Sequence, residues 1–539
     1  MPQATCCLAF GVACALLFPA ACHAADSRPN ILLAIADDQS FPHASAYGTP
    51  GIATPGFDAV ARRGVRFQNA FTPAPGCSPM RAALLTGRNI WQIGPAGTHA
   101  SSFPADLPTF PDTLANSGYA VGYTGKGWGP GNFRVSGRTQ NPAGPAFSRR
   151  KQASPKGISS IDYAANFEDF LATRDEDQPF CFWFGAQEPH RSYDNGIGKR
   201  NGADLSKISV PSFLPDDPAI RSDIADYFYE IEWFDKHLQR MLTTLEQAGE
   251  LDNTLVIVTS DNGMPFPRAK ANLYEFGIHM PLAICWPDRF TPQPPCDALV
   301  NLIDLTATIY DAAQTASSAV QPPAGRSLLA MLKSGKPPGD WPTAIFSGRE
   351  RHSSSRFNTL GYPCRCIRTQ EYLYIRNYYP ERWPAGSPQK YDSVTYDQAS
   401  EIVTSQLGGE TAGYHDIDAC PTFSWMLSHR DQPHVATLLD AAVGLRPADE
   451  LYAIQTDPAC LDNLADDPQQ AATLKRLQEQ LSDYLHSTGD LRELQPQAAH
   501  VWETHPRYSS LRWFPKPAWA IADPSQVPAQ AWLEERRPR

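Results

Sequence analysis

Four short apolar runs, each followed by polar residues, most constrain the fold of this chain. They span residues 30–36, 120–123, 180–185 and 254–260. A run of this length with almost no polar residue is typical of a strand buried on both faces, as in a parallel sheet. The chain is therefore predicted to be an α/β protein, with functional residues beyond the carboxyl ends of these strands.

Helical patterns lie between the strands. An apolar stripe at helical spacing runs over 228–245, and a shorter helix is expected over 58–63. In the last third of the chain the pattern changes. Residues 366–369 and 372–376 are expected to form paired antiparallel strands, and leucines over 474–485 predict a late helix. The C-terminal part is therefore expected to form a smaller antiparallel sheet.

The N-terminus has the pattern of an export signal. Residues 6–19 are almost entirely apolar or small, and the small residues at 20–25 offer a cleavage site. A buried N-terminal helix and a lipoprotein anchored through Cys22 are the alternatives. We predict a signal peptide over 1–25 and a secreted or periplasmic protein. No other run is long and apolar enough to span a membrane, so an integral membrane protein is not expected.

Net charge and cysteine spacing restrict the possible ligands. The formal net charge of -11 argues against nucleic-acid binding, although a cleft on an acidic protein can still attract a small anion. The cysteines after residue 25 show no zinc-binding spacing. Among them, Cys285 and Cys296 are considered as a disulfide pair, which the sequence alone does not decide.

Cys77 stands in a segment with the chemistry of a reactive centre. Ser78 as N-cap and Pro79 as first helical residue would place Cys77 just ahead of a helix N-terminus. That end favours an anion and thiolate character. Arg81 is expected on the same side of the helix, so an oxyanion would fit between the two. The alternatives are that Cys77 is a buried structural thiol and that Arg81 is an ordinary surface charge.

Carboxylates at two strand ends predict a metal site. Asp37 and Asp38 follow the first apolar run, while Asp261 and Asn262 follow the last. These hard oxygen ligands suit Ca²⁺ or Mg²⁺ rather than zinc. The alternative is that Asp-Asp and Asp-Asn-Gly are ordinary turn sequences.

The strings Cys77-Ser78-Pro79-Met80-Arg81 and Leu84-Leu85-Thr86-Gly87-Arg88 together resemble the signature of the type I sulfatases. In that family a maturation enzyme oxidises the cysteine to formylglycine. The resemblance covers nearly the whole mature chain, and within the family it is closest to the heparan N-sulfatases (sulfamidases), most sharply over 261–267.

The resemblance implies a fold and an activity. It implies an alkaline-phosphatase-like large mixed sheet flanked by helices over 26–355, and a smaller α+β subdomain with a wrapping tail over 356–539. The implied activity is hydrolysis of sulfate from a sulfated glycan, with the N-sulfate of glucosamine in heparan or heparin fragments favoured. An O-sulfatase, a related phosphodiesterase or phosphonate hydrolase, and a non-catalytic glycan-binding protein are the alternatives. A homodimer is left open.

The resemblance also implies the roles of the acidic residues and of Cys77. Asp37, Asp38, Asp261 and Asn262 would hold one Ca²⁺, with modified Cys77 as a further ligand. One hydroxyl of the hydrated formylglycine would attack sulfur, and the other would then expel sulfate.

The resemblance implies further roles for the cationic residues and for His190. Arg81, Lys126 and Lys270 would offset charge on the sulfate, with Arg268 as a competitor for the place of Lys270. His190 would protonate the leaving group.

Trp128 departs from the family pattern, because it stands where a catalytic histidine is expected. His99, His279 and His352 are candidates to replace that base. Arg351 and His352 are expected to contact the sugar, with a polar loop as the alternative. Trp128 itself would either stack on a sugar ring or lie in the core.

Overall fold

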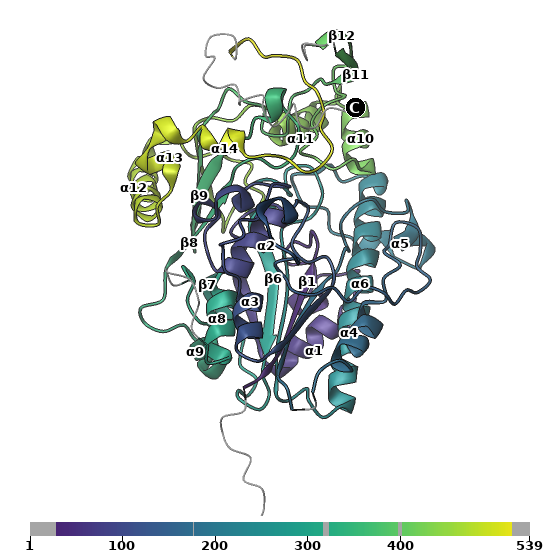
Figure 1. The fold of residues 1–539 in the computed structure, drawn as a ribbon. Helices are drawn as coiled ribbons and strands as arrows, with labels where there is room; N and C mark the ends of the chain where they lie inside the picture. The colour runs from purple at the N-terminus through teal and green to yellow at the C-terminus, as the bar shows by residue number, and fades with distance from the viewer. Residues whose placement is uncertain (1–27, 176, 316–322, 397–401, 520–539) are drawn as a thin grey trace, which may run out of the picture.

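The computed structural model describes residues 28–175, 177–315, 323–396 and 402–519 (Figure 1). The predicted signal peptide over 1–25 lies outside these described residues. No helix among the described residues has the length and apolarity needed to cross a membrane.

The larger of the two main sheets has seven strands in the order β3-β4-β1-β5-β6-β2-β7. Its strands are β1 Asn30–Ala36, β2 Val65–Phe71, β3 Ala120–Gly125, β4 Phe180–Gly185, β5 Thr254–Ser260, β6 His279–Cys285 and β7 Cys296–Asn301. The strands β3, β4, β1 and β5 are parallel, while β6 is antiparallel to both its neighbours. All four predicted strands are therefore confirmed, and they are adjacent in a mixed sheet.

Strand β1 lies between β4 and β5, and its register aligns three carboxyl ends. Ile35 pairs with Gly185 on one side and with Thr259 on the other. Polar residues that follow these strands therefore emerge at the same edge of the sheet.

Helices cover both faces of this sheet (Figure 1). The helices of this part of the chain are α1 Pro55–Arg63, α2 Cys77–Thr86, α3 Phe110–Asn116, α4 Tyr163–Leu171, α5 Ile197–Arg200, α6 Pro218–Gln247, α7 Glu275–Ile278, α8 Asp304–Ala312 and α9 Leu329–Ser334. Alternate residues of β1 enter two separate cores, because successive strand side chains point to opposite faces. Leu33 packs with residues of α2, α3 and α8, and Leu32 packs with residues of α1, α4 and α6.

The smaller sheet has the order β13-β10-β9-β8. The elements of this part are β8 Ala344–Arg349, β9 Cys364–Thr369, β10 Tyr372–Asn377, β11 Tyr391–Tyr396, β12 Ile402–Leu407, α10 Pro421–Ser428, α11 Pro433–Val443, β13 Asp449–Ala453, α12 Ala471–Ser487, α13 Leu491–Leu494 and α14 Val501–Thr504. The predicted β9–β10 pair is confirmed as antiparallel, and α12 is the predicted late helix. Strand β8 precedes the expected boundary at residues 355 and 356 yet pairs with β9, so this sheet starts before that boundary.

The cysteines of the described chain are all free thiols and all buried. Cys285 belongs to the core on one face of the large sheet and Cys296 to the core on the other. The sheet therefore separates the two sulfur atoms, and the disulfide considered from the sequence does not form. Cys296 Sγ instead lies 3.9 Å from the Met331 sulfur.

After α14 the chain crosses back over the molecule as an extended segment, yellow in Figure 1. The backbone N–H of Tyr508 donates to the carbonyl of Ala100, and that of Tyr391 donates to Trp513. The first bond places the C-terminal segment against the loop that follows α2, and the second joins it to the start of β11.

Candidate active site

Cys77 is the first residue of α2, and extended Gly76 is its N-cap. The helix therefore begins two residues earlier than predicted. The Ser78 hydroxyl is not a cap, because it accepts the N–H of Ala100 at 2.9 Å. Burial raises the pKa of Cys77 to about 11, so the expected thiolate character is wrong. Desolvation outweighs the helix N-terminus here, and the unmodified thiol is a poor nucleophile.

The carboxylates that follow β1 and β5 converge near Cys77. Asp37, Asp38 and Asp261 each offer an oxygen, and these oxygens lie within 4.8 Å of one another. The Asn262 amide donates to Asp38 at 2.7 Å. Burial and the neighbouring charge of Asp37 raise the pKa of Asp261.

This cluster fits a divalent cation. The Oδ1 atoms of Asp37 and Asn262 are buried and have no hydrogen-bond partner among the described residues. Buried oxygens without partners are rare and costly, and a hard cation would satisfy both of them.

Each of three predicted cations pairs with a different carboxylate of the cluster. The pairs are Lys126 with Asp37, Lys270 with Asp38 at 2.6 Å, and Arg81 with Asp261 at 2.8 Å. Arg268 is directed elsewhere, since its guanidinium donates to the carbonyls of Ala441 and Cys460. The structure thus brings Lys270, rather than Arg268, to the site.

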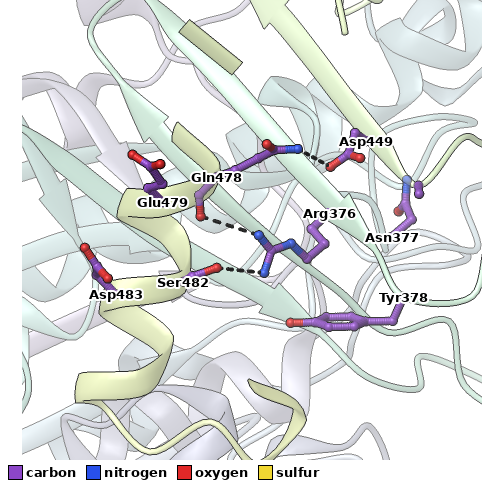
Figure 2. A pocket seen from close by; sticks show the side chains of 9 residues that line it. Arg376, Asn377, Tyr378, Asp449, Gln478, Glu479, Ser482 and Asp483 are labelled. Atoms are coloured by element: carbon purple, nitrogen blue, oxygen red, sulfur yellow. Dashed lines mark hydrogen bonds between the residues drawn. The ribbon is translucent and has the colours of Figure 1, made fainter. Parts of the chain in front are cut away.

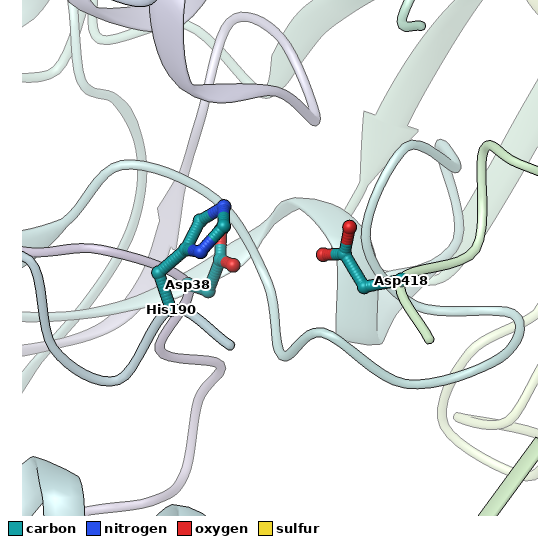
Figure 3. A group of neighbouring side chains, drawn as sticks. All are labelled: Asp38, His190 and Asp418. Atoms are coloured by element: carbon teal, nitrogen blue, oxygen red, sulfur yellow. The ribbon is translucent and has the colours of Figure 1, made fainter. Parts of the chain in front are cut away.

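His190 lies beside the cluster with a carboxylate that the sequence did not suggest (Figure 3). Asp38, His190 and Asp418 each place one ligand atom within 4.8 Å of the others. Asp418 also accepts from Lys270 at 2.9 Å. Burial alone would raise the pKa of Asp418, but Lys270 and His190 hold it below its usual range. Asp418 comes from the C-terminal part, where no sequence motif marked it.

Of the three candidate histidines, His99 lies against the reactive centre. Its Nε2 is 3.4 Å from Cys77 Sγ, and the His352 ring lies 4.6 Å from its own ring. Burial lowers the pKa of His99 well below its usual value, so the imidazole is neutral. His279 is excluded from this position, since it stacks on Phe41 and bonds to the carbonyl of Gln68.

Trp128 is a core residue that supports α2. Its indole N–H donates to the carbonyl of Ser78 at 3.1 Å, and its ring packs edge-on against Phe103. Only 4% of the residue is exposed. The side chain therefore holds the first turn of α2 in place, and its ring is too buried to stack on a sugar.

The two residues expected to contact the sugar lie in different surroundings. The Arg351 guanidinium donates to the carbonyls of His505 and Pro506, so it holds the C-terminal segment. His352 lies beside His99, and a Cβ on Gly76 would come within 3.0 Å of its Nδ1. Of the pair, His352 is the one that lies beside the start of α2.

Two cavities bear on where a ligand would bind. A cavity of about 550 Å³ opens beside the cluster and is lined by Asp37, Lys126, Trp128, Asn141, Gln187, His190 and Arg191. Another, of about 620 Å³, lies between β10 and α12 (Figure 2). Its lining includes Asp449, Glu479 and Asp483, and its Arg376 is paired with Glu493 at 2.8 Å. An anionic ligand is therefore better suited to the first cavity.

Known proteins are similar to this chain over most of its length. The sulfatase family profile matches residues 29–315. Human N-sulphoglucosamine sulphohydrolase is 30% identical over 504 residues, which cover 86% of this chain and 91% of the human protein. The N-acetylglucosamine-6-O-sulfatase of Bacteroides thetaiotaomicron is 26% identical, with 65% of this chain and 79% of that protein covered.

Solved structures show the same fold. A protein in complex with its substrate D-glucosamine-2-N,6-O-disulfate has a TM-score of 0.60 at 20% identity, covering 87% of this chain and 99% of that one. The phosphonate monoester hydrolase of Agrobacterium radiobacter has a TM-score of 0.59 at 17% identity, covering 86% and 97%. At these identities the likeness concerns the fold alone.

Proposed function

This chain belongs to the sulfatase family, and on that premise we propose that it hydrolyses the N-sulfate of glucosamine in heparan or heparin fragments. The observation that carries this choice is the similarity to human N-sulphoglucosamine sulphohydrolase, which extends over most of both chains. Three cations and a cluster of metal-ligand oxygens lie near Cys77, and this arrangement supports sulfate as the group transferred.

The site needs a stronger nucleophile than the thiol it holds. Formylglycine made from Cys77 would supply a geminal diol, and a Ca²⁺ held by Asp37, Asp38, Asp261 and Asn262 would polarise the bound sulfate. Because the pKa of Cys77 is about 11 and the side chain is buried, conversion by a maturation enzyme is a requirement of the proposal.

Three cations of the chain offset the negative charge that develops on the sulfate. Arg81, Lys126 and Lys270 are fixed by their carboxylate partners, so their positive charge is already in place when sulfate charge develops. Preorganised charge of this kind is worth more in a buried site than in water.

Two histidines divide the proton transfers in this proposal. An amine leaves a sulfur atom only when it is protonated, so an N-sulfate needs an acid. His190 suits that role, because its Nδ1 bonds the carbonyl of Arg191 at 2.6 Å and its Nε2 is left to carry the proton. His99 suits the opposite role, since its neutral Nε2 lies beside the side chain of residue 77.

An O-sulfatase is the second candidate function. The similarity to an N-acetylglucosamine-6-O-sulfatase supports it, although less of this chain is covered by that match.

One assay separates the two candidates. The matured protein, with conversion of Cys77 verified by peptide mass spectrometry, is given glucosamine N-sulfate and glucosamine 6-O-sulfate in parallel. Release of sulfate from the N-sulfate with at least tenfold higher kcat/KM supports the proposal. Preference for the 6-O-sulfate establishes the second candidate, and release from neither by fully converted protein contradicts both. Cys77→Ala is the inactive control.

We also propose export to the periplasm or the medium, on the sequence pattern of residues 1–25. N-terminal sequencing of protein recovered from the periplasm would support it by starting near residue 26. Full-length protein retained inside the cell would contradict it.

A further inference from the structure

Arg507 is a buried cation that forms no ion pair within the described chain. Only 4% of it is exposed. Its Nη1 donates to the carbonyl of His352 at 3.1 Å, and its Nε has no hydrogen-bond partner among the residues described. A buried guanidinium normally has a carboxylate beside it, because the loss of hydration is otherwise uncompensated.

The C-terminal segment brings this cation to the reactive centre. Tyr508, the next residue, donates its backbone N–H to Ala100, which follows His99. Arg507 itself bonds the backbone of His352, whose ring lies 4.6 Å from that of His99. Arg507 therefore lies beside a pair of neighbouring histidines, of which His99 contacts Cys77.

The surroundings of Arg507 are positively charged. Burial, followed by repulsion from Arg351 and Arg512, lowers the pKa of Arg507 to about 9, although Asp416 attracts the guanidinium. The carboxylate of Asp416 does not neutralise it, because that group is already paired with Arg349 and with Arg356. An anion from outside the chain would supply the missing countercharge.

We propose that Arg507 forms a second anion subsite, which binds a sulfate or carboxylate of the glycan other than the sulfate that is cleaved. This inference rests on the proposed function, which assigns the scissile sulfate to residue 77 and to the cations Arg81, Lys126 and Lys270. A planar guanidinium binds either group through two parallel hydrogen bonds, and low exposure strengthens such bonds. The preferred substrate is therefore a sugar that carries at least two anionic groups.

Binding to a variant that cannot be matured tests the subsite without activity. The parent is the full-length Cys77→Ala protein. Calorimetry measures its affinity for glucosamine N-sulfate, for glucosamine N,6-O-disulfate, and for N-sulfoglucosamine linked to a uronic acid. We expect one or both of the dianionic sugars to bind about tenfold more tightly than the monosulfate, as one charged hydrogen-bonded pair provides. The sugar that shows the gain identifies sulfate or carboxylate as the second group.

Arg507→Gln, added to the parent, assigns the gain to this residue. We expect it to remove the advantage of the dianionic sugars and to leave the affinity for the monosulfate within twofold. Lys516→Gln is the matched control, since it removes an exposed cation of the same segment and is expected to change neither affinity. Arg507→Lys keeps the charge without the paired donors and is expected to retain part of the advantage, and it serves if the glutamine variant does not fold.

Two results would overturn the subsite. One is equal affinity of the parent for mono- and dianionic sugars. The other is a loss in Arg507→Gln that is the same for all three sugars. A parent that binds no sulfated sugar contradicts the proposed function itself, and the subsite with it.

Discussion

The Nε2 atom of His99 lies 3.4 Å from the sulfur of Cys77, close enough to hydrogen-bond the side chain at that position. The loop that carries His99 is fixed to α2, because Ala100 donates its N–H to the hydroxyl of Ser78. Trp128 bonds the carbonyl of the same serine. One turn of α2 therefore anchors both His99, beside Cys77, and Trp128, which stands where the resemblance to the sulfatases implied a histidine.

His99→Ala is expected to lower kcat by about 100-fold with little change in KM, as loss of a positioned proton acceptor does. Steady-state kinetics on glucosamine N-sulfate measures this, after mass spectrometry has shown equal formylglycine content. His434→Ala is the control, because that histidine is exposed on α11. A fall in kcat of less than threefold would remove His99 from the catalytic machinery.

Trp128→Phe is expected to lower the free energy of unfolding by about 1–3 kcal/mol, because the buried Ser78 carbonyl loses its donor. Denaturant unfolding measures the change. Trp233→Phe is a matched control, since the Trp233 indole N–H is buried with no partner among the described residues and its removal is expected to cost little. Equal destabilisation by both substitutions would show that the Ser78 bond is not the cause.

Removal of the divalent cation is expected to abolish activity and to lower the melting temperature. A bound cation would offset three clustered carboxylates, and a ligand at 100 times its Kd stabilises a protein by about 2.7 kcal/mol. Scanning calorimetry with chelator, and after return of Ca²⁺ or Mg²⁺, measures both the effect and the preference. Asp38→Asn is expected to weaken the response to Ca²⁺. An unchanged melting temperature in chelator, with full activity, would mean that the cluster holds no required cation.

Glu230 gives the protein a defined pH dependence of stability. Both its carboxylate oxygens are buried without a partner among the described residues, and burial raises its pKa to about 9. The folded state therefore keeps a proton that the unfolded state releases above the ordinary pKa of 4.5. Stability is expected to fall as pH rises from 4.5 to 9, at up to about 1.4 kcal/mol per unit.

Glu230→Gln isolates that contribution, because glutamine has the same shape and does not ionise. The variant is expected to be more stable than the parent at pH 8, with a difference that shrinks toward pH 5. Melting temperatures between pH 5 and 9 measure it, and Glu381→Gln, at an exposed position, is the control. A difference that is independent of pH would show that the carboxyl does not titrate in this range.

Much of the fold follows from local sequence patterns. The apolar run of β1 and the helical stripe of α6 depend on the residues within each element, so they were predictable. The start of α2 was not, because the Ser78 hydroxyl bonds Ala100 across a loop instead of capping its own helix. The separation of Cys285 and Cys296 was not predictable either, because they are close in sequence but lie on opposite faces of the large sheet.

The sequence by itself determined the kinds of chemical group at the site: carboxylates at two strand ends, cations near them, and Cys77 at a helix start. Only the tertiary structure decided which groups meet. It placed His99, of the three candidate histidines, against Cys77, and it brought Asp418 to the carboxylate cluster and Arg507 to the backbone of His352. It also made the thiol of Cys77 unreactive. Separation along the chain does not limit distance in space, and desolvation depends on packing that no local pattern encodes.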